Sequence, residues 1–591
     1  MCGVFGYIGD EDPLNICVAA LEQLEYRGYD STGIAGLSSG QITIYKEAGK
    51  LANLKLKLQP KTFALAIGHT RWATHGKVNN QNAHPHFDAE EQIAIVHNGI
   101  IENYDELKEK LQSEGVSFHS ETDTEVVVQL VAKHYKGDLV EAVRNTLPLL
   151  KGQFAFAFIH KNHPDLIVAT ARECPLSIGF DDPRSQSIIS SDPNAFLGVT
   201  LNVLFLRNDE IAKVQKGKVE ISDRDRKIVA RKTERLEGRN KAPSKEGFAH
   251  FLLKEIFEQP ATIQKAILGR MDEDAVQFES LSEEFRKAKR VWFIGCGTSA
   301  NAGMIGTLFL EDLAHIPAHT EIASEARYRI IPEGTLVVAI SQSGETADTI
   351  SAVREIRGRG HKVLGICNVA NSTLTRETDG CIFLKAGPEV SVCSSKAFTS
   401  QIAVLYLFAL YMAKKSDPEL KKIPAQVQQV LDQAPEIQKM AQKYSRYNDF
   451  FFMGRRYMYP TCMEAALKLK EISYVNANGY PAGELKHGPI ALIDSNFPVI
   501  AFCANHKTQD KILSNLQEVK ARGAPILALA PENLKAAASI AHDVIWLPPA
   551  SDELSPFAST VAGQLLAYYI ALARGCDIDQ PRNLAKSVTV E

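Results

Sequence analysis

The sequence predicts a sheet-rich α+β domain followed by two doubly wound α/β domains. Three observations predict this order: short strand-like runs within residues 2–222, a charged stretch at 223–247, and a strand, loop and helix pattern that occurs twice afterwards. At roughly 150 residues per domain, 591 residues are sufficient for this organisation. With 45% hydrophobic and 23% charged residues, the composition is that of a globular protein with several cores.

Residues 2–222 contain short apolar or alternating runs, such as 63–67, 92–96 and 154–159, flanked by turn residues. Few long helical patterns separate these runs, so we expect an α+β domain of layered sheets with helices. The following stretch, 223–247, is rich in charge, poor in apolar residues and closed by Pro, Ser and Gly. Such a composition indicates a linker.

The remainder of the chain contains an internal duplication. Three elements recur at an offset of about 160 residues: the strands ending at Gly295 and Gly454, the strands around Ile340 and Phe502, and the helices opening at Phe398 and Phe557. Continuous apolar strands such as 336–340 suit a parallel sheet covered on both faces. We therefore expect two α/β domains, 248–425 and 426–578, that bind ligands beyond the carboxyl ends of their strands.

Two loops rich in hydroxyl side chains follow strands of the first copy and form a candidate phosphate site. One loop contains Ser341, Ser343 and Thr346, with the amide of Gln342 between them, and the other contains Thr298 and Ser299. A helix N-terminus offers free amides and a positive dipole end to a phosphate, and hydroxyls add donors. The alternative is an ordinary helix cap, since Ser and Thr favour that position. The occurrence of two such loops favours a phosphosugar pocket.

A helix predicted at 463–477 carries Glu464, Lys468 and Glu471 within about 60° of one another. These groups could stage proton transfer, or they could form a solvated stripe of ion pairs worth a few tenths of a kcal/mol each. The loop 483–489 then places His487 between glycines, which is typical of an active-site loop.

The tail, 579–591, follows a long helix and carries Lys586. Most such tails are disordered. This tail alternates apolar and polar residues, so it could instead enter a cleft and deliver an amine.

Cys2 becomes the first residue once the initiating Met is removed, which a small second residue permits. It then carries a thiol and a free α-amine, whose pKa of about 7.7 to 8.0 suits it to accept the thiol proton. On the cysteine alone, a chance small hydrophobe is the stronger interpretation.

Two segments predicted as loops, 68–76 and 97–104, favour the nucleophile. Arg71 suits an α-carboxylate and Asp123 suits an ammonium, so the two could hold a free amino acid. Asn98 and the Gly99 amide offer two donors to an oxyanion, as glutamine cleavage needs. His84 and His86, with further histidines nearby, could instead bind a metal, but no acidic or cysteine ligand pattern accompanies them.

The net charge of -4 and the lack of a basic block give no indication of a nucleic-acid partner. The longest apolar run, 402–413, is shorter than the roughly 20 residues of a membrane span. No signal-peptide pattern is present, so we expect a cytoplasmic protein without a membrane partner. Ten cysteines without zinc spacing are expected to be mostly reduced.

Eight motifs together resemble the glutamine:fructose-6-phosphate amidotransferase family: MCGVFGYIG, ALEQLEYRGYDSTGIA, GHTRWATHG, HNGIIENY, SQSGETADT, SSKAFTSQ, GELKHGP and DQPRNLAKSVTVE. Each half alone also suits other families, namely amidotransferases with an N-terminal nucleophile and sugar isomerases. The order and co-occurrence of the motifs over nearly the whole chain are much more specific. The resemblance implies an N-terminal nucleophile glutaminase domain followed by two sugar isomerase domains.

The resemblance also implies residue roles. In glutamine cleavage they are Cys2 as nucleophile, Arg71, Thr74, His75 and Asp123 as glutamine ligands, Asn98 and Gly99 as oxyanion hole, and Trp72 as ammonia gate. In the isomerase half they are Thr298, Ser299, Ser341, Gln342, Ser343 and Thr346 around the phosphate, Ser395 near the sugar, His487 in ring opening, Lys586 in the imine, and Glu471, with Lys468 and Glu464, in proton transfer. The family needs no metal or organic cofactor.

The implied activity is synthesis of glucosamine 6-phosphate and glutamate from fructose 6-phosphate and glutamine, the first step toward UDP-N-acetylglucosamine. The resemblance further implies a homodimer in which His487 reaches into the other subunit. Two alternatives remain open: an amidotransferase for another phosphosugar, and a sugar-phosphate sensor without turnover. Binding alone needs none of Cys2, Glu471, His487 and Lys586, which argues against the sensor.

Overall fold

The structure is a computed structural model that describes residues 2–181, 183–196, 199–236, 244–272, 275–278, 281 and 283–589. Part of the predicted linker, 237–243, and the last two residues of the predicted tail lie outside the described residues. The chain divides into two compact units: an N-terminal unit, Met1–Ala242 with Ser587–Glu591, and a C-terminal unit, Pro243–Lys586. The domain boundaries expected from the sequence remain predictions.

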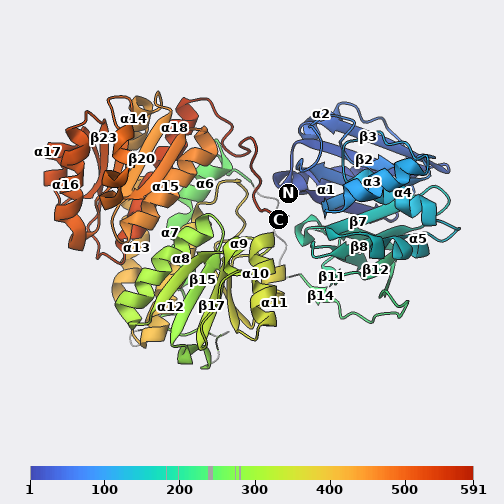
Figure 1. Cartoon of the computed structure of the whole chain (residues 1–591), viewed down its shortest axis with the longest axis horizontal. Coiled ribbons are helices and arrows are strands. Elements are labelled where there is room, and N and C mark those ends of the chain that lie inside the picture. The colour runs from blue at the N-terminus through green and yellow to red at the C-terminus, as the bar shows by residue number, and fades with distance from the viewer. Residues whose placement is uncertain are drawn as a thin grey trace. The chain divides into compact units, whose positions relative to one another are not determined.

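The N-terminal unit contains two antiparallel sheets (Figure 1). The eight-stranded sheet has the order β14 (Glu234–Arg235), β11 (Asn202–Phe205), β9 (Ser177–Asp181), β10 (Gln186–Ser190), β1 (Gly3–Ile8), β4 (Leu65–Arg71), β2 (Ser31–Ser38), β3 (Gln41–Ala48). The six-stranded sheet has the order β13 (Lys218–Ser222), β12 (Ile211–Gln215), β8 (Ile167–Arg172), β7 (Gly152–His160), β6 (Ile93–Ile101), β5 (His86–Phe87).

These sheets form a four-layer sandwich. Alternate residues of β1 and β7, such as Val4 and Ala157, meet in a core between the two sheets. The opposite faces pack on helices: α1 (Pro13–Leu24) and α2 (Leu51–Lys55) cover the larger sheet, and α3 (Tyr104–Ser113), α4 (Thr124–His134) and α5 (Leu139–Thr146) cover the smaller one. The expectation of layered sheets with helices is confirmed.

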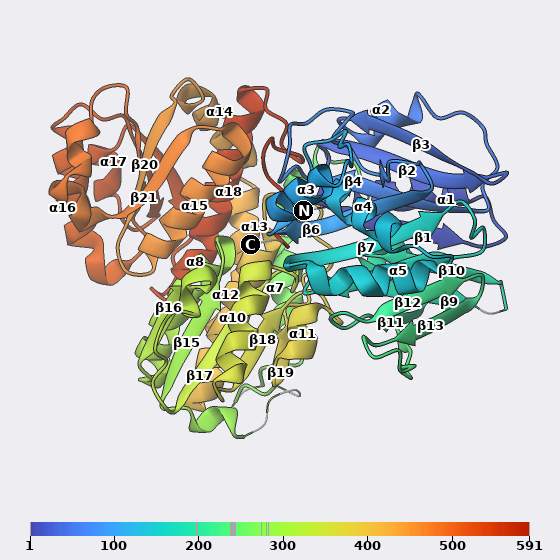
Figure 2. The ribbon, with the colours of Figure 1, turned by 45° about the vertical axis from the view of Figure 1, so that its right-hand side comes forward.

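The C-terminal unit contains two parallel five-stranded sheets with equivalent strand order (Figure 2). The first runs β16 (Ala318–Ile322), β15 (Arg290–Gly295), β17 (Thr335–Ser341), β18 (Val363–Cys367), β19 (Gly380–Phe383), and the second runs β21 (Asn476–Pro481), β20 (Asp449–Gly454), β22 (Val499–Phe502), β23 (Ile526–Pro531), β24 (Asp543–Leu547). In each copy the second strand along the chain lies at the edge of the sheet, next to the first strand. The predicted duplication is therefore present in the topology.

Helices cover both faces of each of these sheets, as a doubly wound fold requires. One apolar core joins the inner faces of the two copies. Its helices are α6 (Phe251–Phe257), α7 (Gln259–Ile267), α8 (Thr298–Phe309), α12 (Lys396–Ala413), α13 (Ile423–Leu431), α14 (Ala434–Tyr444), α15 (Met458–Ser473) and α18 (Ser555–Ala573). The outer faces pack on α9 (Ala323–Ala326), α10 (Ala347–Gly358) and α11 (Thr373–Glu377), and on α16 (Gln509–Lys520) and α17 (Ala536–Ile540).

Two of these helices, α12 and α18, are long and apolar enough to cross a membrane by length and composition alone. In the most apolar 18-residue stretch of each helix, 94% of α12 and 83% of α18 is buried within the fold, as expected of core helices.

The expected boundaries of three segments were wrong. The helix expected at 463–477 is α15, which begins five residues earlier at Met458 and ends at Ser473, because Tyr474 adopts a left-handed backbone and β21 then pairs with β20. The segments expected as loops at 68–76 and 97–104 begin as strand: β4 extends to Arg71 and β6 to Ile101. Backbone pairing with β1 and β7 extends these strands into the motifs.

Candidate active sites

In the N-terminal unit, Cys2 immediately precedes β1, and β1 pairs with β4 so that Gly3 lies opposite Thr70. The backbone N–H of Trp72, just beyond β4, donates to Sγ of Cys2 at 3.2 Å. The Asn98 Nδ2 on β6 donates to the carbonyl oxygen of Cys2 at 2.9 Å. The structure therefore brings the predicted nucleophile together with two predicted partners from different strands.

The environment of Cys2 favours the neutral thiol over the thiolate. Burial raises the pKa of the thiol, whereas the hydrogen bond from the Trp72 backbone and the charge of Arg71 act in the opposite direction. Nucleophilic attack needs the thiolate, so a base must lie beside the sulfur.

Arg71 and Asp123 are both almost fully buried, at 3% and 4% exposure. The Arg71 Nη2 donates to the carbonyl oxygens of His75 and Gly76, while Nη1 has no partner among the described residues. The Asp123 Oδ2 accepts from the Ile101 N–H at 2.8 Å. Burial lowers the pKa of Arg71, and the negative charges of Asp30 and Asp123 oppose that shift. An unpaired guanidinium edge is therefore available to a carboxylate.

Three predicted residues lie farther out. Thr74 is exposed, and its Oγ1 lies 3.4 Å from Nδ1 of His75. The His75 ring meets Tyr104 edge-on at 5.0 Å, and the Trp72 ring meets Tyr29 edge-on at 6.5 Å. These side chains form a half-exposed rim beside the buried pair.

Gly99 could not be replaced by a residue with a side chain. Its φ is +125°, and a Cβ atom there would lie 2.0 Å from the carbonyl oxygen of Gln153. The backbone of β6 is therefore free to present the Gly99 amide only because the residue is glycine.

The sequence analysis missed His69, which orients Asn98. The His69 Nε2 lies 3.1 Å from Oδ1 of Asn98 and 2.8 Å from the carbonyl oxygen of His97. Both are acceptors, so this nitrogen carries the proton, and the amide of Asn98 is turned with Nδ2 toward Cys2. Burial lowers the pKa of His69 to about 3, so the ring is neutral. The sequence did hold one signal for this role. His69 and Arg71 lie two residues apart on one strand, so their side chains share a face.

The neighbouring histidines bond to protein groups. His84 stacks on His69 at 4.2 Å, and His84 Nε2 and His97 Nδ1 both reach Oγ1 of Thr124. His86 Nε2 lies 3.2 Å from Oγ1 of Thr122. In the part of the chain that the structure describes, no three His, Cys, Asp or Glu side chains are placed to hold a metal ion.

In the C-terminal unit, α15 of the second copy lies against the start of α8 of the first copy. The Lys468 Nζ lies 3.3 Å from Oε1 of Glu464 and 2.8 Å from Oε2 of Glu471. It also donates to Oγ1 of Thr298 at 2.9 Å, and Thr298 in turn donates to Glu464 at 3.0 Å. The Asn301 amide, missed in the sequence, donates to the other Glu464 oxygen at 2.8 Å.

This stripe is not solvated. The side chains of Lys468 and Glu464 are 2% and 1% exposed, and that of Glu471 is 21% exposed. Burial opposes the charge on Lys468, but the two carboxylates prevail and raise the pKa of Lys468 well above its usual value. Burial raises the pKa of Glu464. Only Glu471 combines a charged partner with partial exposure, so it is the carboxylate accessible to a ligand.

The hydroxyl loop connects β17 to α10. The Ser341 Oγ accepts from the Gly344 N–H at 2.9 Å and lies 3.4 Å from Oγ1 of Thr346. Thr346 occupies the N-cap position of α10, yet its side chain makes no capping bond. Gly344 has φ +69°, and a Cβ atom there would lie 2.0 Å from Oγ of Ser372. The loop is thus held tightly, with the Thr346 hydroxyl not used as a cap.

Two more predicted residues, Ser299 and Ser395, lie near this sheet edge. The Gln401 side chain donates to Oγ of Ser299 at 3.0 Å. Ser395 is fully buried just before α12, and its Oγ has no partner among the described residues.

Lys586 is held by Glu389, a residue that sequence analysis missed. The Nζ donates to Oε2 of Glu389 at 2.5 Å, and the two side chains are 3% and 0% exposed. At Lys586 the tail is therefore buried, as in the alternative in which it enters a cleft, and the disordered alternative is not supported there. His487, at the end of a short helical turn (Ala482–His487), is exposed, and no hydrogen bond or ion pair connects it to the other predicted residues among those described.

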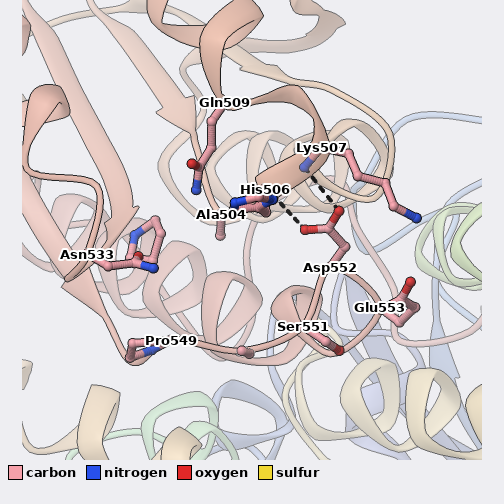
Figure 3. A pocket seen from close by; sticks show the side chains of 11 residues that line it. Ala504, His506, Lys507, Gln509, Asn533, Pro549, Ser551, Asp552 and Glu553 are labelled. Atoms are coloured by element: carbon pink, nitrogen blue, oxygen red, sulfur yellow. Dashed lines mark hydrogen bonds between the residues drawn. The ribbon is translucent and has the colours of Figure 1, made fainter.

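Figure 3 shows the equivalent sheet edge of the second copy, where a cavity of about 330 Å³ lies beyond β22, β23 and β24. Here the carboxylate of Asp552 accepts from the backbone N–H groups of His506 and Lys507, at 2.5 and 3.2 Å. In the second copy a carboxylate of the chain itself thus binds backbone amides at this sheet edge.

Comparison with known families agrees with this division. A glutamine amidotransferase domain matches residues 69–198, and a SIS domain matches residues 284–411 and again 443–574. The two SIS matches fall on the two parallel sheets.

Curated relatives match this chain over its whole length. The chain is 44% identical to the glutamine--fructose-6-phosphate aminotransferase [isomerizing] of Caldanaerobacter subterraneus and 45% identical to that of Methanosarcina acetivorans, with 100% of each chain covered. Among solved structures, the C-terminal domain of glucosamine-fructose-6-phosphate aminotransferase from Francisella tularensis matches with a TM-score of 0.55 and 41% identity. That match covers 57% of this chain and 100% of the other.

Proposed function

The chain belongs to the glutamine–fructose-6-phosphate aminotransferase (isomerizing) family, and we infer that it joins two half-reactions. It hydrolyses glutamine and transfers the ammonia to fructose 6-phosphate with isomerisation, giving glucosamine 6-phosphate and glutamate. This reaction opens the route to UDP-N-acetylglucosamine. The carrying observation is that Cys2 lies within hydrogen-bond reach of Trp72 and Asn98 in one unit, while Lys586 lies on Glu389 in the other.

For the first half-reaction, we propose that removal of Met1 frees the α-amine of Cys2, which takes the thiol proton. The sulfur then attacks the δ-carbonyl carbon of glutamine, and the amide nitrogen leaves as ammonia with that proton. Water hydrolyses the resulting thioester to glutamate. The buried thiol requires such a base, because burial raises the pKa of Cys2.

The substrate's own charges suit the buried pair beside Cys2. Arg71 would hold the α-carboxylate through its unpaired edge, and Asp123 would hold the α-ammonium. Thr74 and His75 would close over the amino acid from the rim. The Gly99 amide and Nδ2 of Asn98 would hold the oxyanion, which requires Nδ2 to turn from the Cys2 carbonyl to the developing charge.

Ammonia released into water would be protonated and lost as a nucleophile, so transfer needs an enclosed route between the two reactions. We propose Trp72 as the gate of this route, as the family resemblance implies.

For the second half-reaction, Ser341, Gln342, Ser343 and Thr346, with Thr298 and Ser299, would hold the phosphate of fructose 6-phosphate. Lys586 would condense with the C2 carbonyl to form an imine and release water. Glu471 would carry the proton between C1 and C2, because it is the stripe carboxylate with access to a ligand. Lys468 and Glu464 would keep Glu471 in place, and Ser395 would face the sugar.

We further propose that the active form is a homodimer in the cytoplasm, in which the exposed His487 assists ring opening in the other subunit. A sensor without turnover is disfavoured, since binding alone needs none of Cys2, Glu471, His487 and Lys586. Transfer to a different phosphosugar is tested by the same experiment as the main proposal.

The test is incubation with glutamine labelled with ¹⁵N at the amide and with fructose 6-phosphate, followed by mass spectrometry of the sugars. We expect label in glucosamine 6-phosphate. Labelled ammonia without labelled sugar would contradict the proposed acceptor, and unlabelled ammonia would contradict the proposed donor. Replacing fructose 6-phosphate by other ketose phosphates in parallel tests the alternative acceptor.

A further inference from the structure

A buried carboxylate that the mechanism above does not use, Glu255 on α6, lies beside the Lys586–Glu389 pair. Its side chain is 2% exposed. Its Oε1 accepts from the backbone N–H of Val390 at 2.6 Å and of Ser391 at 3.3 Å. Its Oε2 is buried without a hydrogen-bond partner among the described residues. Glu255 therefore holds the segment that begins with Glu389.

Glu389 is anchored to the other end of the same segment. It accepts from the backbone N–H groups of Ser395 and Ala397 at 2.9 and 3.0 Å and from Oγ of Ser394 at 2.9 Å. These bonds leave one direction of the carboxylate for Nζ of Lys586. Two glutamates thus hold segment 389–397 in place: Glu255 binds its start, and Glu389 binds its end. Of these two, Glu389 contacts Lys586.

The two glutamates differ in charge. Burial and the charge of Glu389 raise the pKa of Glu255 to about 8. For Glu389, burial is outweighed by Lys586 and by the hydrogen bonds, so its pKa falls to about 2. The other cation near Glu255 is Lys396, which pairs with Glu258 at 2.5 Å. Burial thus favours the neutral form of Glu255, whereas Glu389 is the carboxylate of the two that holds the negative charge facing Lys586.

We propose that Glu255 is a positioning residue of the sugar site: by accepting from the backbone N–H groups of Val390 and Ser391 it keeps Glu389 aimed at Lys586. This inference rests on the proposed imine at Lys586. For the imine to form, Lys586 passes a proton to Glu389, and its neutral amine adds to the carbonyl carbon of the ketose. Glu389 then returns the proton to the departing hydroxyl, water leaves, and a protonated imine remains paired with Glu389.

Ionised Glu255 would place a second negative charge near Lys586 and favour its ammonium form, which cannot add to a carbonyl. Imine formation should therefore fall at alkaline pH, opposite to the usual rise when a lysine loses its proton. Each pH unit above the ionisation lowers the neutral fraction of Glu255 by about tenfold. A glutamate with a purely structural role would not produce this alkaline decline in imine formation.

The experiment traps the imine with borohydride in the full-length chain supplied with fructose 6-phosphate from pH 6 to 10, and quantifies modified Lys586 by peptide mass spectrometry. In the wild type, trapping should decline above pH about 8. In Glu255→Gln, which stays neutral and keeps an acceptor for Val390, trapping should persist and exceed the wild type severalfold at pH 9. Glu258→Gln, a change in a neighbouring carboxylate, should retain the decline.

An alkaline decline that is unchanged in Glu255→Gln would overturn the Glu255 proposal, while absence of any trapped Lys586 in the wild type would overturn the imine and hence the proposed function. Glu255→Asp gives a second test that does not depend on the fold of the Gln variant. Its shorter side chain cannot reach Val390, so trapping at pH 7 should fall severalfold, and an unchanged yield would contradict the positioning role. Far-ultraviolet circular dichroism and thermal unfolding of the same samples report whether the C-terminal unit of each variant is folded.

Discussion

The Nζ of Lys468 donates to Oγ1 of Thr298 at 2.9 Å, so a buried cation of the second α/β copy is tied directly to the first loop of the first copy. The same ammonium lies within ion-pair distance of Glu464 and Glu471. One residue thus links the two products of the duplication and neutralises the carboxylates at their boundary.

Lys468→Met should therefore destabilise the C-terminal unit and abolish amino-sugar synthesis. Without the ammonium, two carboxylates would be left unpaired, and removing one partner of a buried ion pair costs about 3–5 kcal/mol. Urea unfolding followed by tyrosine fluorescence measures the loss. The control is Lys470→Met on the exposed side of the same helix, which should change stability by less than about 0.5 kcal/mol. Equal effects of the two changes would contradict the bridging role of Lys468.

The sequence predicted this stripe because three charged residues at helical spacing must share a face whatever the fold. It could not predict Asn301 or Glu389, because these belong to elements that meet the stripe or the tail only in the folded unit. Nor could it distinguish a buried stripe from a solvated one, since the spacing is identical. The strand ends at Arg71 and Ile101 were missed because polar motif residues there resemble a loop, although they alternate along a strand.

Cys2→Ala should reduce glutamine hydrolysis to background, because among the described residues no other thiol bonds to Trp72 or lies beside Asn98. The C-terminal unit should still trap an imine with fructose 6-phosphate. Glutamate release and borohydride trapping in one preparation check both halves, with Cys576→Ala as the matched control. The intact mass of active protein should lack Met1, and full activity with Met1 retained would contradict the α-amine as base.

The N-terminal unit should lose stability as the pH falls below 6.5. His69 has a pKa of about 3 and His97 of about 4 in the folded protein, both below the usual 6.5, because burial disfavours the charged ring. Between pH 6.5 and 4 the unfolded chain binds these protons and the folded chain does not. Each histidine then costs about 1.4 kcal/mol per pH unit, and this stability is fully present above pH about 6.5.

Thermal unfolding from pH 8 to 4.5 measures this effect. His97→Gln should make the acid decline shallower, whereas His119→Gln, a change in an exposed histidine, should leave it as in the wild type. A melting temperature that stays constant from pH 7 to 5 would show that these rings do not control acid stability.

Lys586→Ala should abolish synthesis while leaving fructose 6-phosphate bound, because the phosphate loop belongs to a separate segment of the first copy. The variant leaves Glu389 buried without its cation, so its pKa should rise from about 2 and the carboxylate should take up a proton. Calorimetric titration with fructose 6-phosphate and the ¹⁵N-transfer assay separate the two effects. Unchanged synthesis in this variant would exclude the imine.

Gly344→Ala should weaken binding of fructose 6-phosphate by about tenfold or more, which is about 1.4 kcal/mol. The substitution adds a Cβ atom 2.0 Å from Oγ of Ser372 at a φ of +69°, so the loop must move and the Ser341 and Thr346 hydroxyls with it. Gly360→Ala is the matched control, since Gly360 also has a positive φ, +88°, but no atom lies within 4 Å of its Cβ position. Gly360→Ala therefore introduces backbone strain at a positive φ without a steric clash of the new Cβ atom. Weakened binding in Gly344→Ala alone would locate the phosphate at this loop, and equal binding in both variants would place it elsewhere.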